Sequence, residues 1–302
     1  MARSLGLRQR RQEGPAARED RERAARPPVI GSETAFAKLN LALHVRGREP
    51  DGYHRLETLF AFCEDGDTVA LAGEGAVPLA ITGEFADGLS AGPDNLVRRA
   101  ADGIAALFGL TAPPLTLVKR LPVAAGIGGG SADAAAALRL IARINGIDPG
   151  DARLMTLAAT LGADVPACLV SRPVLGLGRG DVLAPAGDAE LAGLPVLLVN
   201  PRVPLATGPV FAAWDRQDRG PLGPDWRTGR NDLQAPAVTL VPMIADVLAA
   251  LAAQPGVTLA RMSGSGATCF ALFADEAARD AAAVAIDRRW WRLATRLRTL
   301  SP

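Results

Sequence analysis

The chain has 302 residues, with 33 basic and 32 acidic side chains, and this near balance leaves no general field that would attract nucleic acid or a membrane surface. The length suggests about two domains at ~150 residues each, and no apolar run approaches the ~20 residues of a membrane span. Three widely spaced cysteines argue against a disulfide framework or a zinc site. We therefore expect a cytoplasmic protein with reduced thiols and no nucleic-acid or membrane partner. The sequence leaves open whether it is a monomer or a weak dimer.

Residues 1–28 differ in composition from everything that follows. They are rich in Arg, Glu, Gln and Ala, contain few large apolar side chains, and end at Pro27 and Pro28. A segment that cannot bury apolar surface stays disordered, so we predict a disordered tail. The tail lacks the apolar region of a signal peptide, and its acidic residues argue against a transit peptide. A nucleic-acid-binding arm and an upstream start-site extension are the alternatives.

From Thr34 onward the pattern is typical of strands. Leu39, Leu41, Leu43 and Val45 alternate with polar or small residues, as in a strand with one apolar face. A polar turn then leads to a second apolar run, which predicts a long hairpin. The elements expected next are strands at 56–62, 68–71, 79–82 and 115–118, and helices at 95–108, 132–144 and 151–161.

Beyond Pro173 strands and helices alternate again. Residues 195–200 form a continuous apolar run suited to a buried strand, whereas residues 216–230 are rich in Gly and Pro and predict a surface loop. Because the preceding unit is already large enough to fold, we predict a second α+β domain. The predicted domains are 29–190 and 191–302, and the expected late elements are helices at 241–253 and 276–288 and strands at 259–262, 268–273 and 293–299.

Residues 121–133, Leu-Pro-Val-Ala-Ala-Gly-Ile-Gly-Gly-Gly-Ser-Ala-Asp, join a predicted strand to a predicted helix. At a helix N-terminus unpaired N–H groups attract an anion, and glycines let the backbone wrap around phosphate oxygens. The loop is not a Walker motif, because no lysine stands near Gly130. It is not a dinucleotide fingerprint, because Ser131 occupies the sixth position counted from Gly126. The stretch therefore predicts a phosphate-binding loop, and the plainer alternative is a flexible turn.

The pattern P-x-x-x-G-I-G-G-G-S-A resembles the ATP loop of the GHMP kinases, the superfamily of galactokinase, homoserine kinase and mevalonate kinase. Three further segments resemble one of its families, the 4-diphosphocytidyl-2-C-methyl-D-erythritol kinases. They are A-K-L-N-L at 37–41 with D-G-Y-H at 51–54, G-A-D-V-P at 162–166, and the small-residue loop at 262–268. The resemblance runs from residue 35 to residue 273, and the Tyr-His pair is its most specific part.

The resemblance implies an α+β fold in two domains, the two-domain GHMP kinase fold. Its N-terminal domain would be like the second domain of ribosomal protein S5, and its C-terminal domain would be ferredoxin-like. The implied activity is ATP-dependent phosphorylation of the substrate's 2-hydroxyl, in the non-mevalonate route to isoprenoid precursors. ATP and Mg²⁺ are the implied cofactors. The implied partner is a small molecule that bears a cytidine diphosphate group.

The resemblance also assigns roles residue by residue. The family's lysine and aspartate act at the acceptor hydroxyl, which gives Lys38 and Asp164 as catalytic residues. The implied ATP-binding residues are Pro122, Val123, Ala124, Ala125, Gly126, Ile127, Gly128, Gly129, Gly130, Ser131 and Ala132. The implied substrate-binding residues are Asn40, Tyr53, His54, Phe211, Ser265 and Gly266, with Tyr53 and His54 at the cytosine. No residue is assigned as a metal ligand.

The chain departs from the family pattern at two places. Ala167 and Cys168 stand where the family commonly has aromatic residues, and Ala132 and Asp133 replace a frequent Ser-Asn pair. Neither change removes a proposed catalytic group, but both affect the shape of the pocket.

The assigned residues also have structural alternatives. Lys38 would be an ordinary exposed lysine, although the chain has only one other, Lys119. Asp164 would cap a helix, Tyr53 and His54 would close a turn, and Phe211 would be a core side chain. The rival functions are a non-catalytic nucleotide-binding or RNA-binding module and a GHMP kinase acting on mevalonate or homoserine.

Overall fold

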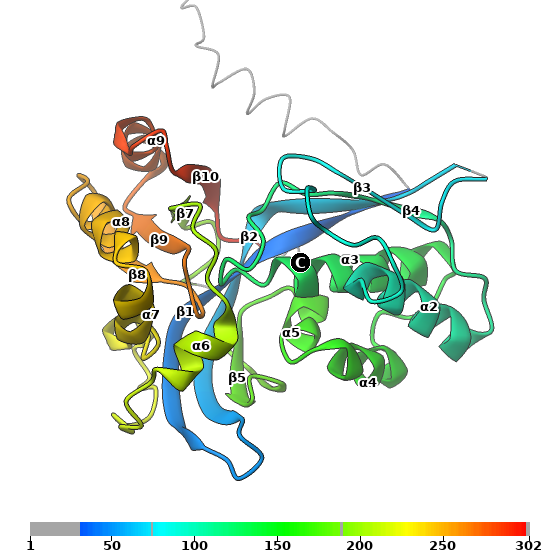
Figure 1. The fold of residues 1–302 in the computed structure, drawn as a ribbon, viewed down its shortest axis with the longest axis horizontal. Helices are drawn as coiled ribbons and strands as arrows, with labels where there is room; N and C mark the ends of the chain where they lie inside the picture. Colours follow the sequence, from blue (N-terminus) through cyan, green and yellow to red (C-terminus); the bar gives the residue numbers. More distant parts are fainter. Residues whose placement is uncertain (1–30, 74, 188–189, 300–302) are drawn as a thin grey trace, which may run out of the picture.

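The computed structural model describes residues 31–73, 75–187 and 190–299, which form two sheets with helices packed on them (Figure 1). The predicted tail, residues 1–28, lies outside the described residues. The first sheet has the order β3-β4-β2-β5-β6, with β1 paired to β2, and the second has the order β10-β7-β9-β8. The strands are β1 (Ser32–Arg48), β2 (His54–Leu71), β3 (Leu79–Thr82), β4 (Leu115–Val118), β5 (Val174–Gly178), β6 (Val182–Pro185), β7 (Pro195–Asn200), β8 (Val257–Met262), β9 (Cys269–Phe273) and β10 (Trp291–Arg296).

The helices divide between the two sheets, and Figure 1 shows one group on each side of the long β1–β2 hairpin. The first group is α2 (Leu96–Phe108), α3 (Gly129–Ile144), α4 (Ala152–Leu161) and α5 (Val165–Val170). The second is α6 (Thr207–Ala212), the 3₁₀ helix η1 (Trp226–Thr228), α7 (Gln234–Leu240), α8 (Met243–Ala252) and α9 (Glu276–Ala285). The predicted α+β class is therefore confirmed. Among the described residues, no helix has both the length and the apolar character needed to cross a membrane.

Helix α3 is the centre of the first core. Alanine is the best helix former, and its small side chain lets neighbouring elements approach the helix closely. Residues 134–137 are four buried alanines, and Leu138 and Ile141 fill the space beside them. They share this core with Phe60 and Phe62 of β2. The helix starts three residues earlier than predicted, inside the glycine loop itself.

The β1–β2 hairpin is buried on both faces, which corrects the prediction of a single apolar face. Phe60 and Phe62 of β2 pack toward the helices, while Leu59, Ala61 and Cys63 belong to the core shared with the second sheet. In β1, Asn40, Ala42 and His44 are buried as well as the predicted apolar residues. Alternation of apolar and polar residues along β1 does not indicate that its second face is covered, because the covering residues come from the other half of the chain.

The remaining differences are at short elements. The predicted strands at 56–62 and 68–71 are parts of one long strand, β2, and the helices α5, α6 and α7 were not predicted. These three helices have six or seven residues, which is too short for helical periodicity to be recognised. The chain passes from the first sheet to the second between the end of β6 at Pro185 and the start of β7 at Pro195. The domain limits themselves stay a prediction.

The three cysteines are buried and unpaired, as expected for reduced thiols. Burial raises the pKa of Cys168 to about 12, and it also raises the pKa of Cys63 and of Cys269. A thiol that holds its proton at neutral pH is a poor nucleophile. These cysteines therefore act as small apolar side chains of the core.

A buried cluster of charges supports the glycine loop from below. Lys119, which follows β4, donates to Asp67 Oδ2 at 2.5 Å and to Asp133 Oδ2 of α3 at 2.7 Å, and all three side chains are buried. Asp67 Oδ1 also accepts the N–H groups of Arg120 and Leu121, at 2.5 and 2.8 Å. We call Asp67, Lys119 and Asp133 the buried triad. It holds the chain in place where the loop begins.

The triad is electrostatically unbalanced, because two carboxylates face one ammonium group. Burial raises the pKa of Asp133 to about 7; the charge of Lys119 opposes this shift and the charge of Asp67 adds to it. Desolvation alone would lower the pKa of Lys119, but the two carboxylates raise it above its ordinary value. The lysine therefore stays charged at neutral pH.

The raised pKa of Asp133 makes stability depend on pH. Between the ordinary aspartate value of 3.8 and about 7, the folded state holds a proton that the unfolded chain has released. The protonated Asp133 carboxyl therefore stabilises the folded state fully below pH 3.8. This contribution is lost as the pH rises toward about 7, by at most about 1.4 kcal/mol per pH unit. The Asp133→Asn variant lacks this term, so its melting temperature should rise relative to the parent as the pH goes from 4 to 7.

Thermal melts of the parent and the variant across that pH range provide the measurement. An offset for Asp133→Asn that does not change with pH would contradict the prediction.

Candidate functional site

The site is organised by irregularities in β1. The pairing of β1 with β2 shifts between Phe36 and Lys38 and again between Asn40 and Ala42. The backbone N–H of Lys38 donates to Ile127 O at 3.0 Å, and that of Asn40 donates to Ser263 Oγ at 3.1 Å. Bulges are common beside active sites because they redirect side chains and free backbone groups. Here the outward N–H groups of Lys38 and Asn40, on a strand that in the described sheet pairs only with β2, bind two loops that come from different halves of the chain.

Those two loops also bind each other. Ser263 Oγ donates to Gly126 O at 3.0 Å, and the N–H of Thr268 donates to Ala125 O at 3.1 Å. A Cβ on Gly126 would lie 2.4 Å from Ser263 O and 2.7 Å from Gly266 N, so only glycine fits at this position. Gly266 thus lies behind the glycine loop and is not among the residues that line the cavity described below. Its proposed role in substrate binding stays a prediction.

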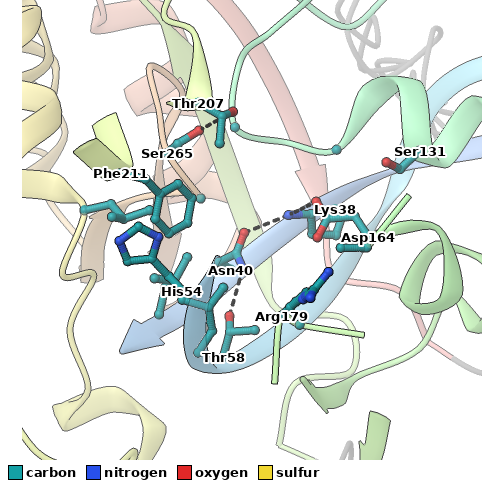
Figure 2. A pocket seen from close by; sticks show the side chains of 18 of the residues that line it. Lys38, Asn40, His54, Thr58, Ser131, Asp164, Arg179, Thr207, Phe211 and Ser265 are labelled. Carbon is teal, nitrogen blue, oxygen red and sulfur yellow. Dashed lines mark hydrogen bonds and ion pairs between the residues drawn. The ribbon is translucent and has the colours of Figure 1, made fainter. Parts of the chain in front are cut away.

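Lys38 and Asp164 meet at the centre of the site, as Figure 2 shows. Lys38 Nζ lies 3.0 Å from Asp164 Oδ2 and donates to Asn40 Oδ1 at 2.8 Å. Asn40 Nδ2 in turn donates to Thr58 Oγ1 at 2.8 Å, and Thr58 donates to Ala42 O at 2.7 Å. This chain of hydrogen bonds fixes the amide orientation of Asn40. The ammonium group of Lys38 is therefore held in one place, which confirms that Lys38 and Asn40 project to the same side of the strand.

The two members of the pair differ in exposure. The Lys38 side chain is 4% exposed and the ammonium group lies 5.0 Å from the centre of the Phe60 ring, whereas the Asp164 side chain is 35% exposed. Asp164 stands at the N-cap position of α5, as the structural alternative expected, but its side chain makes no capping hydrogen bond. The carboxylate is turned toward Lys38 and the cavity instead.

A cavity of about 650 Å³ brings most of the predicted residues together. Its lining includes Lys38, Asn40 and Asp164, and also Tyr53, His54, Phe211 and Ser265. Seven residues of the glycine loop line it as well: Ala124, Ala125, Gly126, Gly128, Gly129, Gly130 and Ser131. Ile127 and Ala132 are buried in the core below the loop.

A second cavity of about 170 Å³ adjoins the glycine loop. It shares Ala124, Gly129 and Gly130 with the large cavity, and the predicted loop residues Pro122 and Val123 line it. Its walls also include the apolar side chains of Leu89, Leu96, Val97 and Leu117. Lys119 and Asp133 of the buried triad supply its charged groups, and Asp133 Oδ1 has no hydrogen-bond partner among the described residues.

The far end of the large cavity is aromatic. The His54 ring lies 4.8 Å from the Phe211 ring at a tilt of 35°, and 5.6 Å from Trp214 with edge-on geometry. Phe211 is on α6 and packs against the hydrophobic core of the second sheet. It also lines the cavity, so it is both a core side chain and a cavity residue. Tyr53 is 56% exposed, and its N–H donates to Asp51 Oδ1 at 3.0 Å, as expected in a turn. Tyr53 and His54 nevertheless both line the cavity.

His54 is neutral at neutral pH. Burial lowers the pKa of its imidazole, and the positive charge of Arg48 lowers it further. A neutral imidazole carries one donor nitrogen and one acceptor nitrogen, so it can read a polar ring edge. Ser265 lies between the aromatic end and the glycine loop, with its Oγ 3.0 Å from Thr207 Oγ1.

Several residues of the site were not predicted. The role of Lys119 could have been predicted from the sequence, because it is one of only two lysines in the chain. Both lysines are buried at this site. Thr58, Thr207 and Arg179 also line the cavity, but their residue types are ordinary for their places in the sequence. They reach the site only through strand pairing and loop packing.

Comparison with known proteins places the chain among kinases. The model of the GHMP kinases N terminal domain matches residues 95–172, and that of GHMP kinases C terminal matches residues 213–292. The 4-diphosphocytidyl-2-C-methyl-D-erythritol kinase of Rhizorhabdus wittichii is 61% identical over 283 residues, which cover 90% of this chain and 96% of the relative. The kinase of the same name from Sphingopyxis alaskensis is 54% identical over 279 residues, which cover 88% and 98%.

A solved structure supports the same assignment. The crystal structure of 4-(cytidine 5'-diphospho)-2C-methyl-D-erythritol kinase matches with a TM-score of 0.74 at 32% identity, and the match covers 89% of this chain and 99% of that one. The predicted two-domain GHMP kinase fold is thereby confirmed. The chain belongs to the GHMP kinases and, within them, to the 4-diphosphocytidyl-2-C-methyl-D-erythritol kinase family.

Proposed function

We propose that this protein transfers the γ-phosphate of ATP to the 2-hydroxyl of 4-diphosphocytidyl-2-C-methyl-D-erythritol, a step of the non-mevalonate route to isoprenoid precursors. One observation carries the proposal. The Lys38–Asp164 pair lies in a single cavity that has the glycine loop on one side and the Tyr53–His54 pair on the other. This order matches a transfer from a nucleotide triphosphate to an alcohol attached to a second nucleotide.

ATP fits the glycine loop and the second cavity together. The loop runs into the N-terminus of α3, where free N–H groups and the helix dipole favour phosphate. The second cavity adjoins the loop and has apolar walls with a polar end, as a purine base requires. We propose that the phosphates lie along residues 124–131 and that the base enters the second cavity.

Magnesium enters the proposal as a companion of ATP. The described residues contain no group of three or more His, Cys, Asp and Glu side chains that would hold a metal by themselves. Mg²⁺ is usually held by one or two protein groups together with substrate phosphates. The Ser131 hydroxyl, which lines the cavity beside the loop, fits such a shared site. The ion would neutralise phosphate charge there.

The catalytic pair has separate tasks in this proposal. Asp164 accepts the proton of the acceptor hydroxyl as the new bond to phosphorus forms. Lys38 orients the hydroxyl and stabilises the negative charge on the transferring group, because its ammonium group is fixed between Asn40 and Asp164. Phosphoryl transfer depends mainly on such positioning and charge stabilisation.

The Asp164→Asn variant tests the proposed base. The amide keeps the size of the side chain but cannot take a proton, so kcat should fall by roughly 10²–10⁴ while ATP binding stays close to that of the parent. Steady-state kinetics and calorimetry provide the two measurements. Asp151→Asn makes the same change at the N-cap of α4, and its kcat should match the parent. Near-normal turnover of Asp164→Asn would remove Asp164 from the mechanism.

Gly128→Ala tests the glycine loop beside the catalytic pair. Gly128 has φ +64°, and a Cβ there would lie 2.9 Å from Lys38 Cε and 3.9 Å from Asp164 Oδ2. Gly146 follows the other end of α3, has the same φ, and has no atom within 4 Å of an added Cβ. Alanine should cost about 1–2 kcal/mol of stability at either position, because both residues are left-handed.

Only the change at Gly128 should impair function, by weakening ATP binding and lowering kcat. Thermal melts, ATP titrations and turnover measurements on both variants separate the two effects. Equal activity of the two alanine variants would contradict a close approach of ATP to this part of the loop.

The Tyr53–His54 pair tests the cytidine assignment. Tyr53 offers an aromatic face, and loss of such stacking typically costs about 1–3 kcal/mol. His54 offers a donor and an acceptor to the ring edge. The parent should prefer the cytidine substrate to its uridine analogue, because uracil would place a carbonyl opposite an acceptor that cytosine meets with an amino group.

Both Tyr53→Ala and His54→Ala should weaken binding of the cytidine substrate and leave ATP affinity unchanged. Both should also reduce the preference for the cytidine substrate over its uridine analogue. Competition assays with the cytidine and uridine substrates measure it. Equal use of both bases by the parent, or faster turnover of mevalonate or homoserine, would favour the alternative small-molecule kinases.

A further inference from the structure

A substrate with a cytidine diphosphate group brings two adjoining phosphates to the large cavity, between the base and the reacting alcohol. The charged side chains that line this cavity are Lys38, Arg48, Asp164 and Arg179. Lys38 is already bonded to Asn40 and Asp164, and Arg48 Nε donates to Gly52 O at 3.2 Å in the hairpin turn. Both arginines therefore keep donors for a further anion, and Arg179 is the one that stacks on Tyr53 of the proposed cytosine site.

Arg179 stands at the turn between β5 and β6. Its guanidinium carbon lies 3.9 Å from the centre of the Tyr53 ring, and Nη2 donates to Asp51 Oδ2. Asp51 also accepts the N–H of Tyr53, so the three residues form one unit. Figure 2 shows the side chain rising from the turn toward the Lys38–Asp164 pair.

The guanidinium group keeps donors for a ligand. Among the described residues, Asp51 is its only hydrogen-bond partner, and the side chain is 45% exposed. A guanidinium group stacks on an aromatic ring through its flat face and offers its N–H groups around the edge, a geometry suited to phosphate. Stacking on Tyr53 therefore leaves part of that edge free for an anion.

We propose that Arg179 is a substrate-binding residue that binds the diphosphate of the nucleotide-bearing substrate; this rests on the function proposed above. Its position is set by stacking on Tyr53, and its side chain lines the cavity and is directed toward the Lys38–Asp164 pair (Figure 2). One side chain thus links recognition of the base to recognition of the phosphates. The competing role is structural, in which Arg179 only holds Tyr53 in position.

Two ligands that differ only in the phosphates separate these roles. Binding of CDP and of cytidine is measured by calorimetry for the parent, Arg179→Gln and Arg179→Lys. A hydrogen bond to a charged group is worth about 1.5–3 kcal/mol, so Arg179→Gln should bind CDP on the order of 10-fold to 100-fold more weakly. Cytidine should change by less than about twofold by the same reasoning, because it lacks the diphosphate. Arg179→Lys keeps the charge and should lie between the parent and Arg179→Gln with CDP.

The chain offers a matched control in Arg202. Its guanidinium carbon lies 5.4 Å from the Phe85 ring centre, it pairs with Glu84 at 2.6 Å, and its side chain is also 45% exposed. It lines neither cavity, so Arg202→Gln should bind both ligands as the parent does. Melting temperatures of all the variants confirm that they are folded.

The outcomes are distinct. If Arg179→Gln loses cytidine binding as much as CDP binding, Arg179 acts only through Tyr53 and the proposal is overturned. Unchanged CDP binding in Arg179→Gln overturns it as well, while the proposed function stands. A parent that binds neither CDP nor cytidine would instead overturn the cytidine site itself, and this inference with it.

Discussion

The site depends on two backbone N–H groups that β1 does not use within its own sheet. Within the described sheet β1 pairs with β2 alone, and alternate N–H groups of such an edge strand face away from its partner. Beside the bulges, the outward N–H groups of Lys38 and Asn40 donate to Ile127 O and Ser263 Oγ. A buried donor left without a partner costs roughly 1–3 kcal/mol, so the two loops have to close on the strand. The same bulges bring the Lys38 side chain to the cavity. This edge of β1 thus sets the positions of the glycine loop, the second loop and the Lys38–Asp164 pair.

The two lysines show how charge is managed in this interior. Burying an ion is costly unless a counter-ion and hydrogen bonds compensate for the loss of water. Lys38 has one carboxylate partner that stays partly exposed, whereas Lys119 has two that are fully enclosed. The exposed partner faces the large cavity, while the enclosed ones brace the loop. The same residue type therefore serves chemistry at one side of the glycine loop and support at the other.

Prediction from the sequence succeeded where the signal was local. The glycine loop, α3 and the buried strand β7 follow from composition and periodicity within a few residues, and the family followed from short motifs. The second covering layer of β1 and the positions of Thr58 and Arg179 could not be predicted in this way. They depend on which residues of distant strands become neighbours, and that is decided by strand register and by the packing of one sheet on the other. Membership of a kinase family also decides against the non-catalytic binding module.

The partners of β1 lie far along the chain. Asn40 binds Ser263, which is 223 positions away, and Val45 donates to Asp232 Oδ2 at 2.8 Å, 187 positions away. Contacts so distant in sequence close large loops and slow folding. During synthesis, β1 cannot form its contacts with Asp232 and Ser263 until nearly the whole chain has left the ribosome. Catalytic competence is therefore a late event in the life of each molecule, and a prematurely terminated chain would hold the glycine loop without the segment that fixes it.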